Sequence, residues 1–130
     1  MVDVTREPYL DDRGPFLMDR SNDSCGTAGE ATLATLRQAG VDIVFGNPGT
    51  TELPVMDTFA EERGPRYSLA LHEGSAVSAA AGYALTTGRP GVAFVHAMPG
   101  VGNAMSMFAG AARCGVPLVL IAGTQDRRHQ

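Results

Sequence analysis

The sequence predicts an α/β fold in which helices cover both faces of a mostly parallel sheet. Two observations predict this class: short apolar runs alternate with longer helical patterns, and each run is apolar along its whole length. A continuously apolar strand fits a parallel sheet, because neither side of such a strand faces water. With 130 residues and 44% apolar content, the chain can form one domain with a moderate core.

The first elements follow a stretch of mixed charge. Residues 1–26 scatter charge, Pro and Gly without sustained periodicity, so we expect a flexible N-terminal arm there and a folded domain over residues 27–130. Thr27 and Glu30 form a candidate capping box for the first helix, and Gly40 is suited to end it.

The alternation of elements continues from residue 41 to residue 122. The expected elements are a strand at 41–45, a turn at 46–50, a helix at 51–60, a strand at 67–71, a helix at 73–86, a turn at 88–91, a strand at 92–95, a helix at 101–114 and a strand at 116–122. The last strand has no successor in the chain, and doubly wound sheets usually continue. We therefore expect the domain to be incomplete at its C-terminal end.

Composition excludes several classes of function. The chain has 10 basic and 14 acidic residues and lacks a basic stripe with interleaved aromatics, so we expect no nucleic-acid partner. All basic residues are Arg, which excludes a Schiff-base or phosphate-loop lysine. Cys25 and Cys114 are far apart in sequence, which favours reduced thiols in a cytoplasmic protein. The apolar segments are much shorter than the roughly 20 residues that span a bilayer, so we expect no membrane partner.

Polar residues follow each predicted strand, and this placement predicts where the site lies. Open parallel sheets bind ligands at the carboxyl ends of their strands. The four polar segments at those ends are 46–51, 72–73, 96–103 and 123–125. We expect these segments to converge on one edge of the sheet.

Glu73 and His96 are the two candidate catalytic residues on that edge. Glu73 lies where an apolar strand gives way to a helix of small residues, so its carboxylate should be neutral, paired or held for proton transfer. A carboxylate that merely stabilises a helix N-terminus explains the same residue. A histidine at the end of a strand is by itself more often a hydrogen-bonded structural residue, but the position of His96 on the same edge as Glu73 favours a role as an acid or base near neutral pH.

Other motifs in the sequence have simpler explanations. His72-Glu73 begins like a zinc-protease helix, but Ala76 occupies the position of the second histidine ligand, and we expect no metal site in the chain. Residues 100–105 resemble a dinucleotide fingerprint with Met105 in place of the third glycine. We interpret this segment as a glycine turn before a helix, with Asn103 nearby. The small residues after Glu73 favour close packing against another helix, for which a second copy of the chain is one candidate.

Four motifs occur together in the order seen in thiamine-diphosphate enzymes. They are GNPGTTELP at 46–54, ALHE at 70–73, GYA at 82–84 and HAMPGVGNAM at 96–105. From about residue 27 to residue 125 the chain therefore resembles that family, and within it most closely the benzoylformate decarboxylase-like enzymes. The resemblance implies the N-terminal, pyrimidine-binding domain, which is a three-layer α/β/α sandwich around a mostly parallel sheet.

The resemblance also implies roles for individual residues. Glu73 matches the glutamate that hydrogen-bonds the pyrimidine ring nitrogen and favours the imino tautomer that removes the thiazolium C2 proton. We expect its apolar surroundings to favour loss of the carboxylate charge. His96 matches a proton-transfer residue, and Thr50 lies where a serine contacts the substrate carboxylate. The remaining expected cofactor contacts are Asn47, Pro48, Gly49, Gly100 and Asn103.

The function implied is that of a thiamine-diphosphate-dependent 2-oxo acid decarboxylase, with the particular 2-oxo acid left open. One alternative is an acetolactate-synthase-type carboligase, although such enzymes typically lack a histidine at position 96. Another is a non-catalytic binding or regulatory module. The Gly-Asp-Gly segment that binds Mg²⁺ and the diphosphate is absent from the sequence. We therefore expect a fragment or a subunit of a split enzyme, inactive alone and completed as a homodimer, a homotetramer or with a partner chain.

Overall fold

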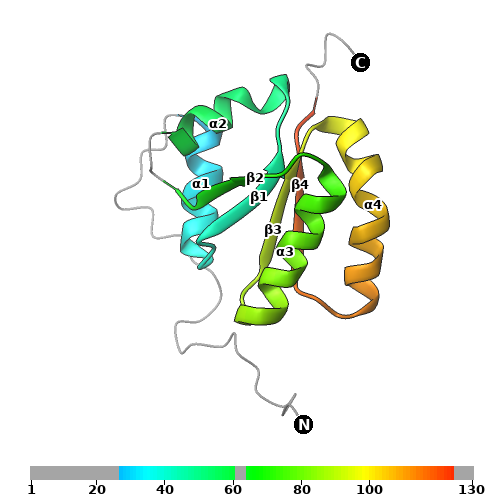
Figure 1. Ribbon diagram of the computed structural model, residues 1–130. Coiled ribbons are helices and arrows are strands. Elements are labelled where there is room, and N and C mark those ends of the chain that lie inside the picture. Colours follow the sequence, from blue (N-terminus) through cyan, green and yellow to red (C-terminus); the bar gives the residue numbers. More distant parts are fainter. Residues whose placement is uncertain (1–26, 61–63, 125–130) are drawn as a thin grey trace.

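Four parallel strands form the centre of the protein in the computed structural model, which describes residues 27–60 and 64–124 (Figure 1). The expected N-terminal arm lies outside the described residues. The elements are α1 (Ala28–Gln38), β1 (Ile43–Asn47), the 3₁₀ helix η1 (Thr50–Glu52), α2 (Leu53–Ala60), β2 (Arg66–Leu69), α3 (Glu73–Thr87), β3 (Gly91–Val95), α4 (Ala97–Arg113) and β4 (Leu118–Ala122).

The sheet has the order β2-β1-β3-β4, and every neighbouring pair is parallel. In β1, Phe45 aligns with Ser68 of β2 on one side and with Ala93 of β3 on the other. The predicted α/β class with a parallel sheet is therefore confirmed. Because the strands all run in one direction, their carboxyl ends lie at one edge of the sheet.

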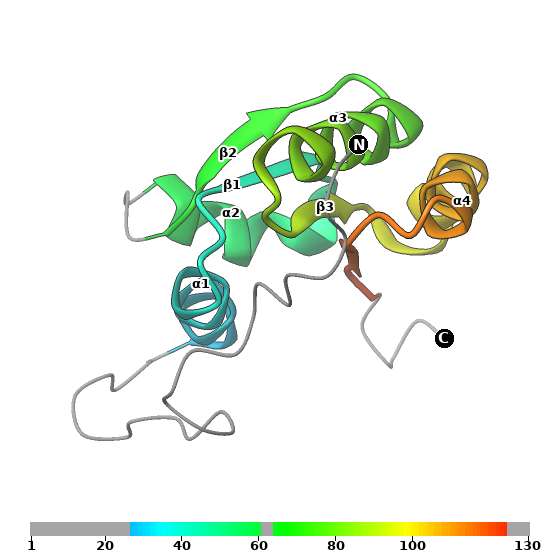
Figure 2. The same cartoon turned by 90° about the horizontal axis from the view of Figure 1, so that it is seen from below.

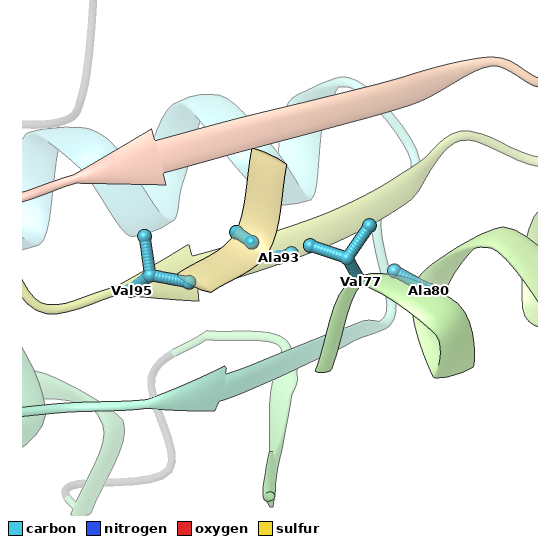
Figure 3. Close-up of a cluster of buried hydrophobic side chains, with 5 residues drawn as sticks. Val77, Ala80, Ala93 and Val95 are labelled. Carbon is cyan, nitrogen blue, oxygen red and sulfur yellow. The ribbon is translucent and has the colours of Figure 1, made fainter. Parts of the chain in front are cut away.

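Helices cover both faces of the sheet and produce three layers (Figures 1 and 2). Helices α1 and α2 lie on one face, and α3 and α4 lie on the other. Alternate residues of β3 point to opposite faces. Val92 and Phe94 belong to the cluster beneath α1 and α2, whereas Ala93 and Val95 pack with Val77, as Figure 3 shows. All five residues of β3 are buried, which explains its uninterrupted apolar sequence.

The first helix begins and ends as predicted from its sequence. The Thr27 hydroxyl accepts a hydrogen bond from the Glu30 N–H at 3.2 Å, and the Thr27 N–H donates to the Glu30 carboxylate at 2.8 Å. This is the capping box expected from the spacing. Gly40 adopts a φ of 78°, a left-handed conformation that favours glycine where the helix stops.

The observed boundary of β1 differs from the prediction because tertiary contacts determine it. Strand β1 begins at Ile43, since the Val41 N–H is already bonded to the Leu36 carbonyl at the end of α1. It extends to Asn47, which aligns with Val95 of β3. The strand therefore delivers Asn47 to the carboxyl edge of the sheet.

Helix α4 begins four residues earlier than predicted, and the interpretation of residues 100–105 as a glycine turn is wrong. Ala97 takes a φ of 42°, so the chain turns immediately after His96. Pro99 follows within the first helical turn, where a missing N–H breaks no internal hydrogen bond. Gly100 and Asn103 consequently lie inside α4, and the Gly100 N–H bonds to the His96 carbonyl at 2.8 Å.

Candidate functional site

The polar segments after the strands converge on the carboxyl edge of the sheet, as the sequence predicts. Asn47 ends β1, Glu73 begins α3 after β2, His96 follows β3, and Gly123 follows β4. Residues 47–52, from the end of β1 through η1, connect two clusters: Asn47 bonds to Glu73, and Glu52 bonds to His96. Glu73 and His96 thus belong to one continuous set of hydrogen-bonded loops.

Glu73 is buried and held by two amides. Its side chain is only 7% exposed. The Asn47 side-chain amide donates to Oε1 at 3.1 Å, and the Asn103 amide donates to Oε2 at 3.0 Å. Gly100 faces the same side chain, and a β-carbon there would lie 3.5 Å from Glu73 Cγ. The carboxylate is therefore fixed from β1 and from α4.

These hydrogen bonds decide the charge of Glu73. Burial acts to raise its pKa, but its own backbone N–H and the amides of Asn103 and Asn47 outweigh burial and hold the pKa below the usual value. The expectation that apolar surroundings favour loss of this charge is therefore wrong, because two amides were not anticipated as direct partners. Glu73 is thus a paired carboxylate at the first position of α3, and its role in proton transfer stays a prediction.

His96 lies in a second cluster with the residues of η1. Its Nδ1 is 2.7 Å from Glu52 Oε2 and 3.2 Å from Thr51 Oγ1, and its side chain is 32% exposed. A β-carbon at Gly49 would overlap the imidazole ring, so glycine is required for this close approach. Nδ1 of the ring is thus in contact with Glu52 and Thr51, while part of the ring stays accessible to solvent.

Glu52 is a functional candidate that the sequence interpretation missed. It is 1% exposed, and it accepts hydrogen bonds from the Gly49 N–H at 2.8 Å and from the Thr51 hydroxyl at 2.5 Å. Burial acts to raise the pKa of Glu52, but Thr51, His96 and Gly49 together hold it below its usual value. The signal that singled out Glu73, a lone carboxylate beside apolar residues, was also present at Glu52 before Leu53 and Val55.

The other predicted site residues occupy the same edge with different surroundings. Asn47, Gly49, Gly100 and Asn103 all contact Glu73 or His96, as described above. Pro48 is half-buried between Asn47 and Gly49. Thr50 is exposed at the start of η1, and the hydroxyl that contacts His96 belongs to its neighbour Thr51. The substrate role expected for Thr50 stays a prediction.

Two hollows flank the beginning of α4. One has a volume of about 410 Å³, lies between α3 and α4, and is lined by His72, Gly74, Ser75, Ser78, Asn103, Ser106 and Met107, with Glu73 not among its lining residues. The other has a volume of about 530 Å³ and is largely apolar; its lining includes Met98, Val101 and Gly123. Hollows therefore exist on both sides of α4, and Asn103 lines one of them, whereas His96 lines neither.

Over residues 27–60 and 64–124, no group of three or more His, Cys, Asp or Glu side chains is arranged to hold a metal ion. None of the helices in these same ranges has both the length and the apolar character needed to cross a membrane.

The fold is a parallel α/β domain whose candidate site lies at the carboxyl ends of its strands, where open parallel sheets generally bind ligands. The family model for the thiamine pyrophosphate enzymes, N-terminal TPP binding domain, matches residues 26–130. The chain belongs to this family.

The relatives with similar sequences are named either as decarboxylases or as acetolactate synthases. The chain is 45% identical to benzoylformate decarboxylase of Pseudomonas aeruginosa over 78% of its own length and 19% of that protein, and 39% identical to acetolactate synthase of Mycobacterium bovis over 78% and 16%. The solved structure of the thiamine diphosphate-dependent 4-hydroxybenzoylformate decarboxylase of Rhodococcus jostii RHA1 is 42% identical, with a TM-score of 0.72 over 78% of this chain and 19% of that one. The chain thus spans less than a fifth of these relatives.

Proposed function

We propose that this chain is the pyrimidine-binding domain of a thiamine-diphosphate-dependent 2-oxo acid decarboxylase, in which Glu73 activates the cofactor. The observation that carries the proposal is the buried Glu73 carboxylate, which Asn47 and Asn103 hold at the ligand-binding edge of the sheet. A charge kept in such a place by two dedicated amides is suited to binding a proton donor.

The donor set around Glu73 fits an aminopyrimidine ring. A carboxylate offers about four acceptor positions, and the two amides use one on each oxygen. Acceptor capacity therefore remains for one further donor, such as a protonated ring nitrogen. Asn103, which donates to Glu73, also lines the hollow of about 410 Å³, and this hollow provides room for a flat ring.

Bound thiamine diphosphate would supply the electron sink that takes up the electron pair left behind when carbon dioxide departs. In this chain the proposed contribution comes from Glu73, whose negative charge would favour a proton on the pyrimidine ring nitrogen that it faces. Asn47 and Asn103 orient the carboxylate. Because they also keep its pKa low, Glu73 is ionised before the cofactor arrives.

His96 supplies the second part of the proposal, proton transfer to or from the substrate. Its Nδ1 is engaged by Glu52, so Nε2 is the nitrogen left for this task. Thr50, exposed at the start of η1, is the proposed contact for the substrate carboxylate. A histidine in this position favours decarboxylation over carboligation.

We further propose that other segments, in the same protein or in a partner chain, hold the diphosphate and Mg²⁺. A homodimer or homotetramer would complete the site, and α3 offers a surface for it, since Ser75, Ser78, Ala79 and Gly82 are exposed. Short side chains of this kind let helices approach closely. The same proposal places the assembly in the cytoplasm.

The proposal is tested in the whole protein, or in this chain combined with the partner that carries the diphosphate site. Glu73→Gln and His96→Gln are each assayed for carbon dioxide release from aromatic and aliphatic 2-oxo acids, with Asp57→Asn, an exposed carboxylate of α2, as the control. We expect both site variants to lose activity by about 100-fold or more, since general acid–base groups contribute about that much. Full decarboxylation by Glu73→Gln rejects the proposal.

A carboligase of the acetolactate-synthase type is the second candidate. The observation that favours it is the 39% identity to acetolactate synthase of Mycobacterium bovis over the same part of the chain. The two candidates differ in their products from pyruvate: a carboligase joins two molecules into acetolactate, whereas a decarboxylase releases the aldehyde. Product analysis therefore discriminates between them.

A further inference from the structure

We infer that Glu52 is a positioning residue that holds His96 as the tautomer with its proton on Nδ1, so that Nε2 is the nitrogen that exchanges protons. The catalytic consequence rests on the proposed function, but the tautomer itself does not. The donors around Glu52 and the hydroxyl of Thr51 determine where the proton lies, and the close packing around Glu52 and His96 keeps the two side chains in contact.

The donors around Glu52 require its carboxylate to act as an acceptor. Oε2 accepts from the Gly49 N–H at 2.8 Å, and a backbone N–H can only donate. His96 Nδ1 lies 2.7 Å from the same oxygen. An ionised carboxylate has no hydrogen to give, and hydrogen bonds keep the pKa of Glu52 low. The proton between Glu52 and His96 therefore resides on Nδ1.

The Thr51 hydroxyl is consistent with the same placement of the proton. Its single hydrogen points to Glu52 Oε1, 2.5 Å away, so its oxygen meets His96 Nδ1 at 3.2 Å with a lone pair. Both polar neighbours of Nδ1 are then acceptors. If Nδ1 carried no proton, its lone pair would face the lone pairs of Glu52 Oε2 and Thr51 Oγ1, and both hydrogen bonds would be lost.

Close approaches of the backbone restrict the movement of Glu52 and of one side of the His96 ring. A β-carbon at Gly49 would overlap the His96 ring, and a β-carbon at Gly123 would overlap Glu52 Oε1. These two glycines come from the loops after β1 and β4. Since the carboxylate is 1% exposed, water does not replace its partners. Two different loops thus hold the contact in place.

Within residues 27–60 and 64–124, Tyr67 of β2 is a further titratable group on which the Glu52 charge acts. Burial and the Glu52 charge raise the pKa of Tyr67 to about 12, so the phenol keeps its proton at neutral pH. Among the described residues its hydroxyl has no hydrogen-bond partner. Tyr67 does not exchange protons with Glu52 under these conditions, and His96 is left as the group that Glu52 orients.

The test is nitrogen-15 NMR of the histidine side chains in the full chain, at a pH where imidazole rings are neutral. The sequence has three histidines, and His96→Gln assigns the signal of interest. We expect a protonated Nδ1 and a bare Nε2. Glu52→Leu removes the acceptor and should shift the proton towards Nε2, whereas Glu52→Gln retains an amide oxygen and should keep the tautomer. Asp57→Asn serves as the control with an unchanged spectrum.

A wild-type His96 with its proton on Nε2 overturns the inference, and so does a tautomer that Glu52→Leu leaves unchanged. If Glu52→Leu does not fold, the wild-type and Glu52→Gln spectra still decide. In turnover assays of the complete assembly, Glu52→Leu should lower kcat by about 100-fold with KM little changed. Full activity of His96→Gln would reject the proposed function while leaving the measured tautomer intact, so the two failures are distinguishable.

Discussion

Asn47, the last residue of β1, donates its side-chain amide to the Glu73 carboxylate at the first turn of α3, across 3.1 Å and 26 positions of sequence. The contact joins the end of one strand to the beginning of the helix that follows the next. Asn103 of α4 completes the arrangement from the other side. Glu73 therefore depends on three separate elements for its position and its charge.

Removal of the Asn103 amide should destabilise the protein. Asn103→Leu leaves one oxygen of a buried carboxylate without its donor, and hydrogen bonds to charged groups contribute about 1.5–3 kcal/mol. We expect the free energy of unfolding at neutral pH to fall by about that amount in urea titrations. Ser106→Ala, an exposed change one turn further along α4, is the control. Equal stability of Asn103→Leu and wild type would contradict the pairing.

Acid should weaken the fold through Glu52 and Glu73. Both groups have folded-state pKa values below the ordinary 4.5, so their stabilisation is complete above pH 4.5 and is lost as the pH falls through the lowered values. Urea titrations at a series of pH values measure this loss directly. In Glu73→Gln the decline below pH 4.5 should be shallower than in wild type. An identical decline in both proteins would show that folding does not lower the pKa of Glu73.

Gly49 should tolerate no side chain. Gly49→Ala places a methyl group against the His96 ring, which must move, and such overpacking costs about 1–3 kcal/mol. Gly102→Ala is the matched control, because nothing lies within 4 Å of a β-carbon there and alanine favours the interior of α4 by about 0.5–1 kcal/mol. Thermal unfolding of the two variants should therefore shift in opposite directions. A harmless Gly49→Ala would mean that the ring is not held as described.

Much of the architecture could be predicted from local sequence, because local signals determine it. The capping box of Thr27 and Glu30, the apolar β3 and the small residues of α3 each reflect neighbours in sequence or a uniform environment. The convergence of polar loops followed from the parallel arrangement alone. Glu73 was found because a carboxylate after an apolar strand is unusual.

The remainder depends on contacts between distant segments. Helix α4 starts at Ala97 because that residue adopts a left-handed conformation, which nothing in an alanine predicts. Glu52 lies beside apolar residues as Glu73 does, but the partners that bury it, His96 and Gly123, come from far along the chain. The charge of Glu73 likewise depends on the Asn47 and Asn103 amides, whose approach only the folded structure reveals.

The most direct test of the account is the rate of proton exchange at the thiazolium C2 of bound thiamine diphosphate, measured in the complete assembly with Mg²⁺. Glu73→Gln keeps the size of the side chain but cannot carry the negative charge that favours a proton on the pyrimidine nitrogen. We predict that exchange slows by about 100-fold or more relative to wild type and to the Asp57→Asn control. An unchanged exchange rate in Glu73→Gln, with the cofactor still bound, would contradict the central role given to Glu73.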